Sequence, residues 1–108
     1  MRRTLFVIAL SLLVCSAVAA ATKHRKPKTH TVVMEAMVFR PAALTVNSGD
    51  TIVWVNKDMF RHTATAKDGS FDIDLKPGAT GVTILKPGAI SVVCRYHPGM
   101  RAMLKVSK

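Results

Sequence analysis

Four side chains in the C-terminal half of the sequence could hold one metal ion. Cys94, His97 and Met100 follow one another at intervals of three residues within CRYHPGM, and His62 lies about thirty residues earlier. One thiolate, two imidazoles and a weak axial thioether are the donors of a mononuclear copper electron-transfer site. A closed zinc site seldom uses a thioether. The donor types therefore predict copper rather than zinc.

Each of these residues has an ordinary structural explanation when it is taken alone. A buried cysteine is usually a small apolar residue, and a methionine near a sheet usually fills the core. The conjunction of four donors at this spacing favours a metal site. Met103 is a second candidate for the axial position, but it lies in the predicted last strand, where we expect a core role, so Met100 ranks first.

A catalytic cysteine is a less favoured alternative. A nucleophilic thiolate needs a base and an oxyanion hole beside it. Cys94 and His97 are close in sequence, but no Gly-rich oxyanion loop and no clear orienting acid accompany them. We therefore expect the protein not to be an enzyme.

The N-terminus has the pattern of a secretory signal peptide, which we assign to residues 1–21. Two arginines precede an apolar run that is too short to span a bilayer, and small residues follow it. Cleavage after Ala19 and cleavage after Ala21 both fit, and either would remove Cys15. Cys94 would then have no partner for a disulfide in the mature chain, so a metal gives the unpaired thiol a purpose.

Residues 22–29 are predicted to form a flexible basic tail, and residues 30–108 one small domain. The chain has 16 Lys and Arg residues against six Asp and Glu, and four of these cations lie in KHRKPK, residues 23–28. Export makes nucleic acid the least expected partner for such a tail. We expect no stable membrane insertion after the signal is removed.

Two further histidines, His24 and His30, are interpreted as tail residues. If cleavage follows Ala21, the new terminus Thr22-Lys23-His24 could also bind Cu(II) through its amine, amide and imidazole nitrogens. Both the cleavage site and this second copper site are left open.

The body of the chain reads as all-β. From His30 onward apolar residues recur with period two or in short runs, and Gly or Pro interrupts them every eight to ten residues. This pattern predicts a β-sandwich or barrel. The expected strands are 31–39, 43–46, 51–56, 62–66, 79–85, 89–94 and 101–107.

Two blocks of sequence resemble the cupredoxin family, in particular small plastocyanin-like proteins of the amicyanin type. They are FRPAALTVNSGDTIVWVNKDMFRHT and FDIDLKPGATGVTILKPGAISVVCRYHPGM. The resemblance implies a Greek-key β-sandwich of about seven to eight strands and one type 1 copper ion. It also implies that His62, Cys94 and His97 are the equatorial ligands and Met100 the axial one.

The sequence departs from many relatives after the first histidine. They have an asparagine there whose side chain ties the two ligand loops together, whereas this chain has Thr63. The tie is therefore expected to be weaker or made by other groups.

The resemblance implies a monomeric protein of the periplasm, or a secreted one, that shuttles single electrons. Its partner would be a c-type cytochrome, a periplasmic dehydrogenase or an oxidase. His97 would present its ring edge at the surface, among the apolar candidates Met59, Phe60, Pro98 and Gly99. The alternative function is a periplasmic copper carrier or buffer that delivers metal rather than electrons.

Three arginines flank the candidate ligands in sequence: Arg61, Arg95 and Arg101. Cations at this position would steer an acidic docking surface toward the site and make association slower at high salt. The sequence therefore predicts a partner with an acidic docking surface.

Overall fold

The computed structural model describes residues 25–108, so the predicted signal peptide and His24 lie outside the described residues. Nine strands and no helix are found in this range. The strands are β1 (Thr29–Glu35), β2 (Val38–Arg40), β3 (Ala43–Asn47), β4 (Thr51–Asn56), β5 (His62–Ala66), β6 (Asp72–Leu75), β7 (Thr80–Ile84), β8 (Gly88–Val93) and β9 (Arg101–Ser107). No helix in residues 25–108 is therefore long and apolar enough to cross a membrane.

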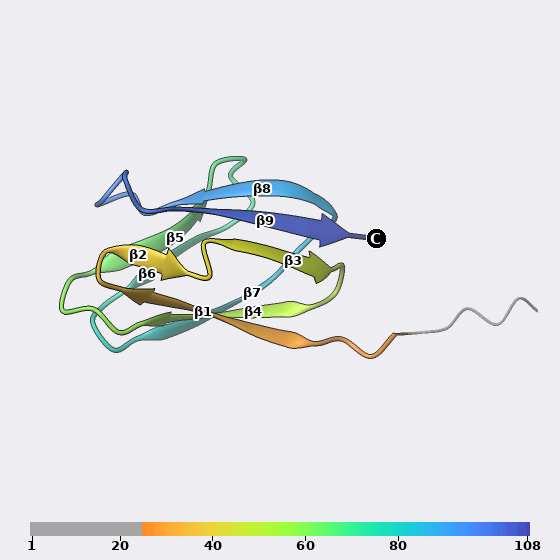
Figure 1. The fold of residues 1–108 in the computed structure, drawn as a ribbon, viewed down its shortest axis with the longest axis horizontal. Coiled ribbons are helices and arrows are strands. Elements are labelled where there is room, and N and C mark those ends of the chain that lie inside the picture. Colours follow the sequence, from red (N-terminus) through yellow and green to blue (C-terminus); the bar gives the residue numbers. More distant parts are fainter. Residues whose placement is uncertain (1–24) are drawn as a thin grey trace, which may run out of the picture.

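The strands form two sheets that pack face to face (Figure 1). One sheet has the order β2-β1-β4-β7, and the other has the order β3-β9-β8-β5-β6. β1 pairs with β4 and β3 pairs with β9 in parallel, while the other pairs are antiparallel. The predicted all-β Greek-key sandwich is confirmed, with one strand more than the expected seven to eight.

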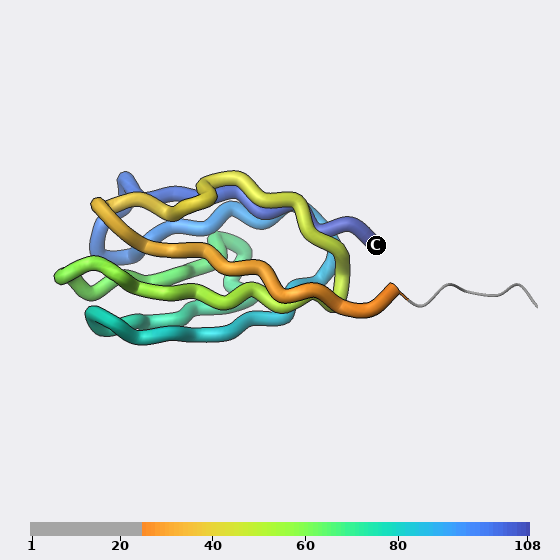
Figure 2. The backbone as a smooth tube through the Cα atoms, turned by 60° about the horizontal axis from the view of Figure 1, so that its bottom comes forward, coloured from red at the N-terminus to blue at the C-terminus, as the bar shows by residue number. Residues whose placement is uncertain are grey.

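The connections between strands gather at the two ends of the sandwich. Figures 1 and 2 show the β4–β5 and β8–β9 connections at one end, and the chain from residue 25 and the C-terminus at the other. All four candidate ligands lie in or beside those two connections. The sandwich therefore brings them to the same end.

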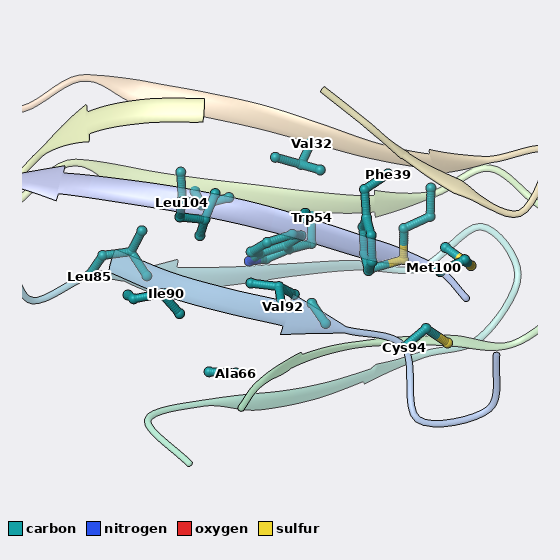
Figure 3. Close-up of a cluster of buried hydrophobic side chains, with 14 of the residues drawn as sticks. Val32, Phe39, Trp54, Ala66, Leu85, Ile90, Val92, Cys94, Met100 and Leu104 are labelled. Carbon is teal, nitrogen blue, oxygen red and sulfur yellow. The ribbon is translucent and has the colours of Figure 1, made fainter. Parts of the chain in front are cut away.

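The core between the sheets is built around Trp54, which is fully buried. Phe39 meets it edge to face and Phe71 at a tilt, each with ring centroids 5.9 Å apart. The indole N–H of Trp54 donates to the Thr83 hydroxyl at 2.9 Å, so its polar atom is satisfied. Figure 3 shows that this cluster extends from Leu104 and Ile90 to Met100 and Cys94. The candidate ligands are thus held at one end of a packed core.

Two predictions of strands were wrong. The expected strand 31–39 is divided by a turn at Ala36 and Met37, whose φ angles are +53° and +64°. The carboxylate of Asp58 accepts hydrogen bonds from both of their N–H groups, and this distant contact supports an unfavourable backbone. β6 was not expected, because its alternating DIDL is short and its aspartates lie on the exposed face.

His30 is not a tail residue, because it lies within β1 and its ring meets the buried carboxylate of Asp50. His30 Nε2–H donates to Asp50 Oδ2 at 2.9 Å, Arg25 donates to the same oxygen at 3.0 Å, and the backbone N–H groups of Lys28 and Asn47 complete the shell. The described end of the predicted tail is thus anchored to the domain. Asp50, an acid that the fold buries just before β4, was the feature of the sequence that could have indicated a partner for His30.

These hydrogen bonds, led by that of the Lys28 N–H, lower the pKa of Asp50 well below its usual range. A lowered pKa in the folded state stabilises the fold above the unfolded pKa of about 3.9, and the contribution is lost as the pH falls below it. We therefore expect the melting temperature to drop steeply between about pH 4 and pH 2. Asp50→Asn should melt lower at neutral pH and lose less on acidification. Parallel melting curves for the two proteins at every pH would contradict this role.

Candidate metal centre

Two segments supply the four candidate ligands: the start of β5 and the β8–β9 connection. His62 is the first residue of β5, Cys94 follows the end of β8, His97 lies in the β8–β9 connection, and Met100 immediately precedes β9. β5 and β8 are antiparallel neighbours with Thr65 opposite Val93. This register carries the chain from β8 past the start of β5, so the sulfur reaches the first imidazole.

Three donor atoms converge at the end of the sandwich. Cys94 Sγ lies 3.7 Å from His62 Nδ1 and 3.8 Å from His97 Nδ1, and the two nitrogens are 3.2 Å apart. The point equidistant from these atoms lies about 2.1 Å from each, and metal–nitrogen and metal–sulfur bonds measure about 2.0 to 2.3 Å. The three residues therefore fit one metal ion in a trigonal arrangement.

Met100 and not Met103 lies at this end of the core. Met100 is buried, and it is tied to the other candidates through its backbone: its N–H donates to His97 C=O at 2.8 Å and its C=O accepts from Cys94 N–H at 3.1 Å. Met103 is 41% exposed on the outer face of β9, where its sulfur lies 4.0 Å from the Ser91 hydroxyl. The expected core role of Met103 was wrong, although its alternation with Arg101 and Lys105 indicates the outer face.

Asp58 orients the first imidazole. Its Oδ2 lies 2.7 Å from Nε2 of His62, so Nε2 carries the proton and Nδ1 keeps its lone pair for a metal. Hydrogen bonds from Met37 N–H and from His62 lower the pKa of Asp58, which keeps it an acceptor. Asp58 was not among the residues predicted for the site. The signal that could have found it is an acid four residues before a ligand histidine.

Asn56 shapes the segment that carries Asp58 and His62. Its side chain is fully buried and donates to the C=O of Phe60 at 2.8 Å and of Leu75 at 3.0 Å. Its Oδ1 accepts from the N–H of Asp58 at 2.9 Å. Each of these hydrogen bonds is buried or partly buried, and together they hold residues 56–60 in place and tie them to β6.

Thr63 ties the two ligand segments together. Its N–H donates to Cys94 Sγ at 3.3 Å, and its hydroxyl oxygen accepts from Arg95 N–H at 2.8 Å. Thr63 is fully buried, so its own atoms in both bonds are shielded from water. The tie between the ligand loops, which was predicted to be weaker or made by other groups, is made by this hydroxyl and by the N–H of Thr63.

His97 lies partly exposed beside apolar surface. Its ring centroid is 6.1 Å from that of Phe60, which is 49% exposed, and Met59 is 79% exposed. Pro98 and Gly99 are also exposed. The four apolar residues predicted to surround His97 are therefore at the surface.

Two of the three arginines near the ligands are paired within the chain. Arg61 Nε lies 2.7 Å from Asp74, and Arg95 Nε lies 3.1 Å from Asp72. Arg101 instead donates to the C=O of Pro98 at 3.1 Å. Most of the positive charge predicted beside the site is thus neutralised by β6.

A family model described as a cupredoxin-like domain matches residues 5–106. The chain belongs to the cupredoxin family. The predicted resemblance is therefore confirmed.

Solved structures show the same fold. A methionine variant of amicyanin in its Cu(I) form is 22% identical with a TM-score of 0.63, over 73% of this cupredoxin and 82% of that chain. A reduced tryptophan-to-tyrosine variant of amicyanin has the same identity, TM-score and coverage. A copper-containing nitrite reductase from Thermus scotoductus is 30% identical with a TM-score of 0.67, over 84% of this cupredoxin but only 25% of that chain.

Proposed function

We propose that this cupredoxin is an exported type 1 copper protein that shuttles single electrons between redox partners. The observation that carries the proposal is the convergence of Cys94 Sγ, His62 Nδ1 and His97 Nδ1 on one point, with the buried Met100 joined to Cys94 and His97 by backbone hydrogen bonds. A thiolate, two imidazoles and a weak thioether are the donors of such sites. His62, Cys94 and His97 would be the equatorial ligands and Met100 the axial one.

A copper ion held there would supply the change between Cu(I) and Cu(II). The residues of the chain orient the donor atoms and exclude water. Asp58 fixes the tautomer of His62, Thr63 N–H holds the cysteine sulfur, and the core excludes water from both. Donors fixed in this way need little rearrangement when the charge of the site changes, and rigid positioning favours fast electron transfer.

The first test is to add Cu(II) to the mature protein and to record its visible spectrum and voltammogram. We expect one equivalent to give an intense copper–thiolate absorption and a reversible one-electron wave. Weak d–d absorption alone would contradict the proposal and would favour copper carriage or binding at the N-terminal tail. Removal of residues 23–28 should leave the spectrum unchanged. Because Arg25 and the Lys28 N–H contact Asp50, a melting curve first shows that the truncated protein is folded, and loss of colour in the folded protein would place the metal elsewhere.

Replacing the axial methionine should change the potential and not the occupancy. Leucine preserves the volume of Met100 in the core, so Met100→Leu should retain copper. Without the thioether donor we expect a higher reduction potential, measured by voltammetry. Met103→Leu on the outer face is the matched control and should leave the potential unchanged. If Met103→Leu changed the reduction potential and Met100→Leu did not, the axial ligand would be Met103.

Electron transfer fits this site better than copper delivery. His62 and Cys94 have no exposed surface, so an acceptor protein could not reach them without opening the β8–β9 connection. Slow release of Cu(I) to a chelator would agree with the burial of both donors.

Electron transfer also fits this site better than catalysis does. The similarity to the nitrite reductase extends over a quarter of that protein. Three surface hollows lie in the described part of the chain, and none is lined by His62, Cys94 or His97. A partly exposed imidazole among apolar residues suits a protein that docks briefly and releases.

We propose that the redox partner, whether a cytochrome, a dehydrogenase or an oxidase of the periplasm, binds the surface around His97 mainly through apolar contacts. Because Arg61 and Arg95 are paired with β6, Arg101 is the one of these three arginines that is most available to an acidic partner. We expect Arg101→Gln to slow association at low salt by on the order of twofold and to have no effect at high salt, in stopped-flow measurements. A steep salt dependence that survives Arg101→Gln would contradict this assignment.

A further inference from the structure

Asp74 on β6 contacts residues beside both candidate histidines. Arg61 Nε donates to its Oδ1 at 2.7 Å, and the Tyr96 hydroxyl donates to its Oδ2. Arg61 immediately precedes His62, and Tyr96 immediately precedes His97. One carboxylate thus joins the segment before β5 to the β8–β9 connection.

Asp72, two residues earlier on the same face of β6, closes a ring of hydrogen bonds. Arg95 N–H donates to the Thr63 hydroxyl at 2.8 Å, the hydroxyls of Thr63 and Thr65 are 2.8 Å apart, and Thr65 donates to Asp72 at 2.7 Å. The guanidinium of Arg95 then donates to the same carboxylate at 3.1 Å. The ring therefore begins and ends on Arg95, the residue that follows Cys94.

The direction of every hydrogen bond in this ring is fixed. The hydroxyl of Thr65 and the guanidinium of Arg95 hold the pKa of Asp72 below its usual value, so it is ionised at neutral pH and only accepts. Thr65 must donate to it, so Thr63 donates to Thr65 and accepts from Arg95. Hydrogen bonds aligned in one direction reinforce each other, and an ionised acceptor strengthens the series.

The buried end of the ring lies against the thiol. Thr63 has no exposed surface, and its N–H donates to Cys94 Sγ. The outer ion pairs are exposed, with side-chain exposures of 44% and 51% for Arg95 and Asp72, and such pairs contribute little by themselves. We therefore expect the Arg95–Asp72 pair to affect the positions of the ligands rather than the stability of the fold.

We propose that Asp72 and Asp74 are positioning residues of the metal centre, which hold the Cys94–His97 segment in register with His62 through Thr65, Thr63, Arg95 and Tyr96. The expected effect of these residues on a bound copper ion rests on the proposed function. The hydrogen-bond ring itself can be tested without copper.

The test without copper is amide hydrogen exchange of Arg95, whose N–H begins the ring. In Asp72→Ala and in Thr65→Val, which replaces the hydroxyl with a methyl group, we expect exchange about two- to tenfold faster, as the loss of one hydrogen bond would give. Thr65→Ser keeps the hydroxyl and should restore the slow rate. Asp68→Ala is the matched control, because Asp68 lies in the β5–β6 turn and bonds only to Ser70. Unchanged exchange in both Asp72→Ala and Thr65→Val would overturn the ring.

The test with copper compares the copper–thiolate band and the potential in Asp72→Ala, Asp74→Ala and the double variant. We expect full copper occupancy with a shifted band in each, a larger shift in the double variant, and none in Asp68→Ala. A wild-type spectrum and potential in all three would overturn the positioning role while leaving the proposed function standing. If the wild-type protein itself gave no such band, the proposed function would fail, and Arg95 exchange would still decide the ring.

Discussion

Cys94→Ser is expected to abolish the intense visible absorption of the protein with Cu(II). That absorption requires a thiolate bonded to copper, and a hydroxyl at the same position binds a soft metal weakly. Within residues 25–108, Cys94 is the one free cysteine, so no other described thiol could take its place. We also expect the reversible one-electron wave to disappear. The measurements are a Cu(II) titration followed by absorption and by voltammetry.

The fold of this variant should survive, which makes the result interpretable. Serine is close to cysteine in size, and its oxygen can still accept from the N–H of Thr63. Melting of the protein without added copper is the control and should change little. Persistence of the full absorption in Cys94→Ser would show that the thiolate at position 94 is not its source.

Asp58→Asn should weaken Cu(II) binding by about 10- to 100-fold, the usual effect of removing a carboxylate that orients a ligand histidine. The ionised carboxylate selects the tautomer of His62 in which Nε2 is protonated and Nδ1 is free. An amide selects it less strongly, because its NH₂ group can face Nε2 instead. The measurement is competition with a Cu(II) chelator of known affinity.

Asp58 also stabilises the β1–β2 turn, so the control has to separate this role from the orientation of His62. Its carboxylate also holds the N–H groups of Ala36 and Met37 in the β1–β2 turn, so the variant should also melt at a lower temperature. Affinity is therefore compared well below the melting transition, with Asp68→Asn as an exposed control. Equal affinities for the wild-type protein and Asp58→Asn would contradict the orienting role.

The types and spacing of the ligands could be read from the sequence because they are local. Cys94, His97 and Met100 occupy one short connection, whose backbone hydrogen bonds close within residues 94–100. The alternation of apolar residues also predicted most strands, since each strand buries one face: β9 buries Ala102, Leu104 and Val106. Both inferences need no knowledge of which strands are neighbours.

Two of the corrections arose where a distant partner decides the local structure. The turn at Ala36 and Met37 is held by Asp58, and His30 is held within β1 by contact with Asp50. Sequence patterns report how well a segment suits a strand, but they do not report which side chain from another segment will satisfy its polar groups. These partners meet only when the two sheets are assembled.

By itself, the sequence determined a sandwich that carries one thiol, two imidazoles and a thioether near the ends of its strands. The tertiary structure decided which methionine lies at the site, which proton His62 carries and which arginines are neutralised. The physical reason is that composition and period fix the face on which a side chain lies. Contacts among Asp58, Asp72, Asp74 and their partners depend instead on the register between strands far apart in the chain.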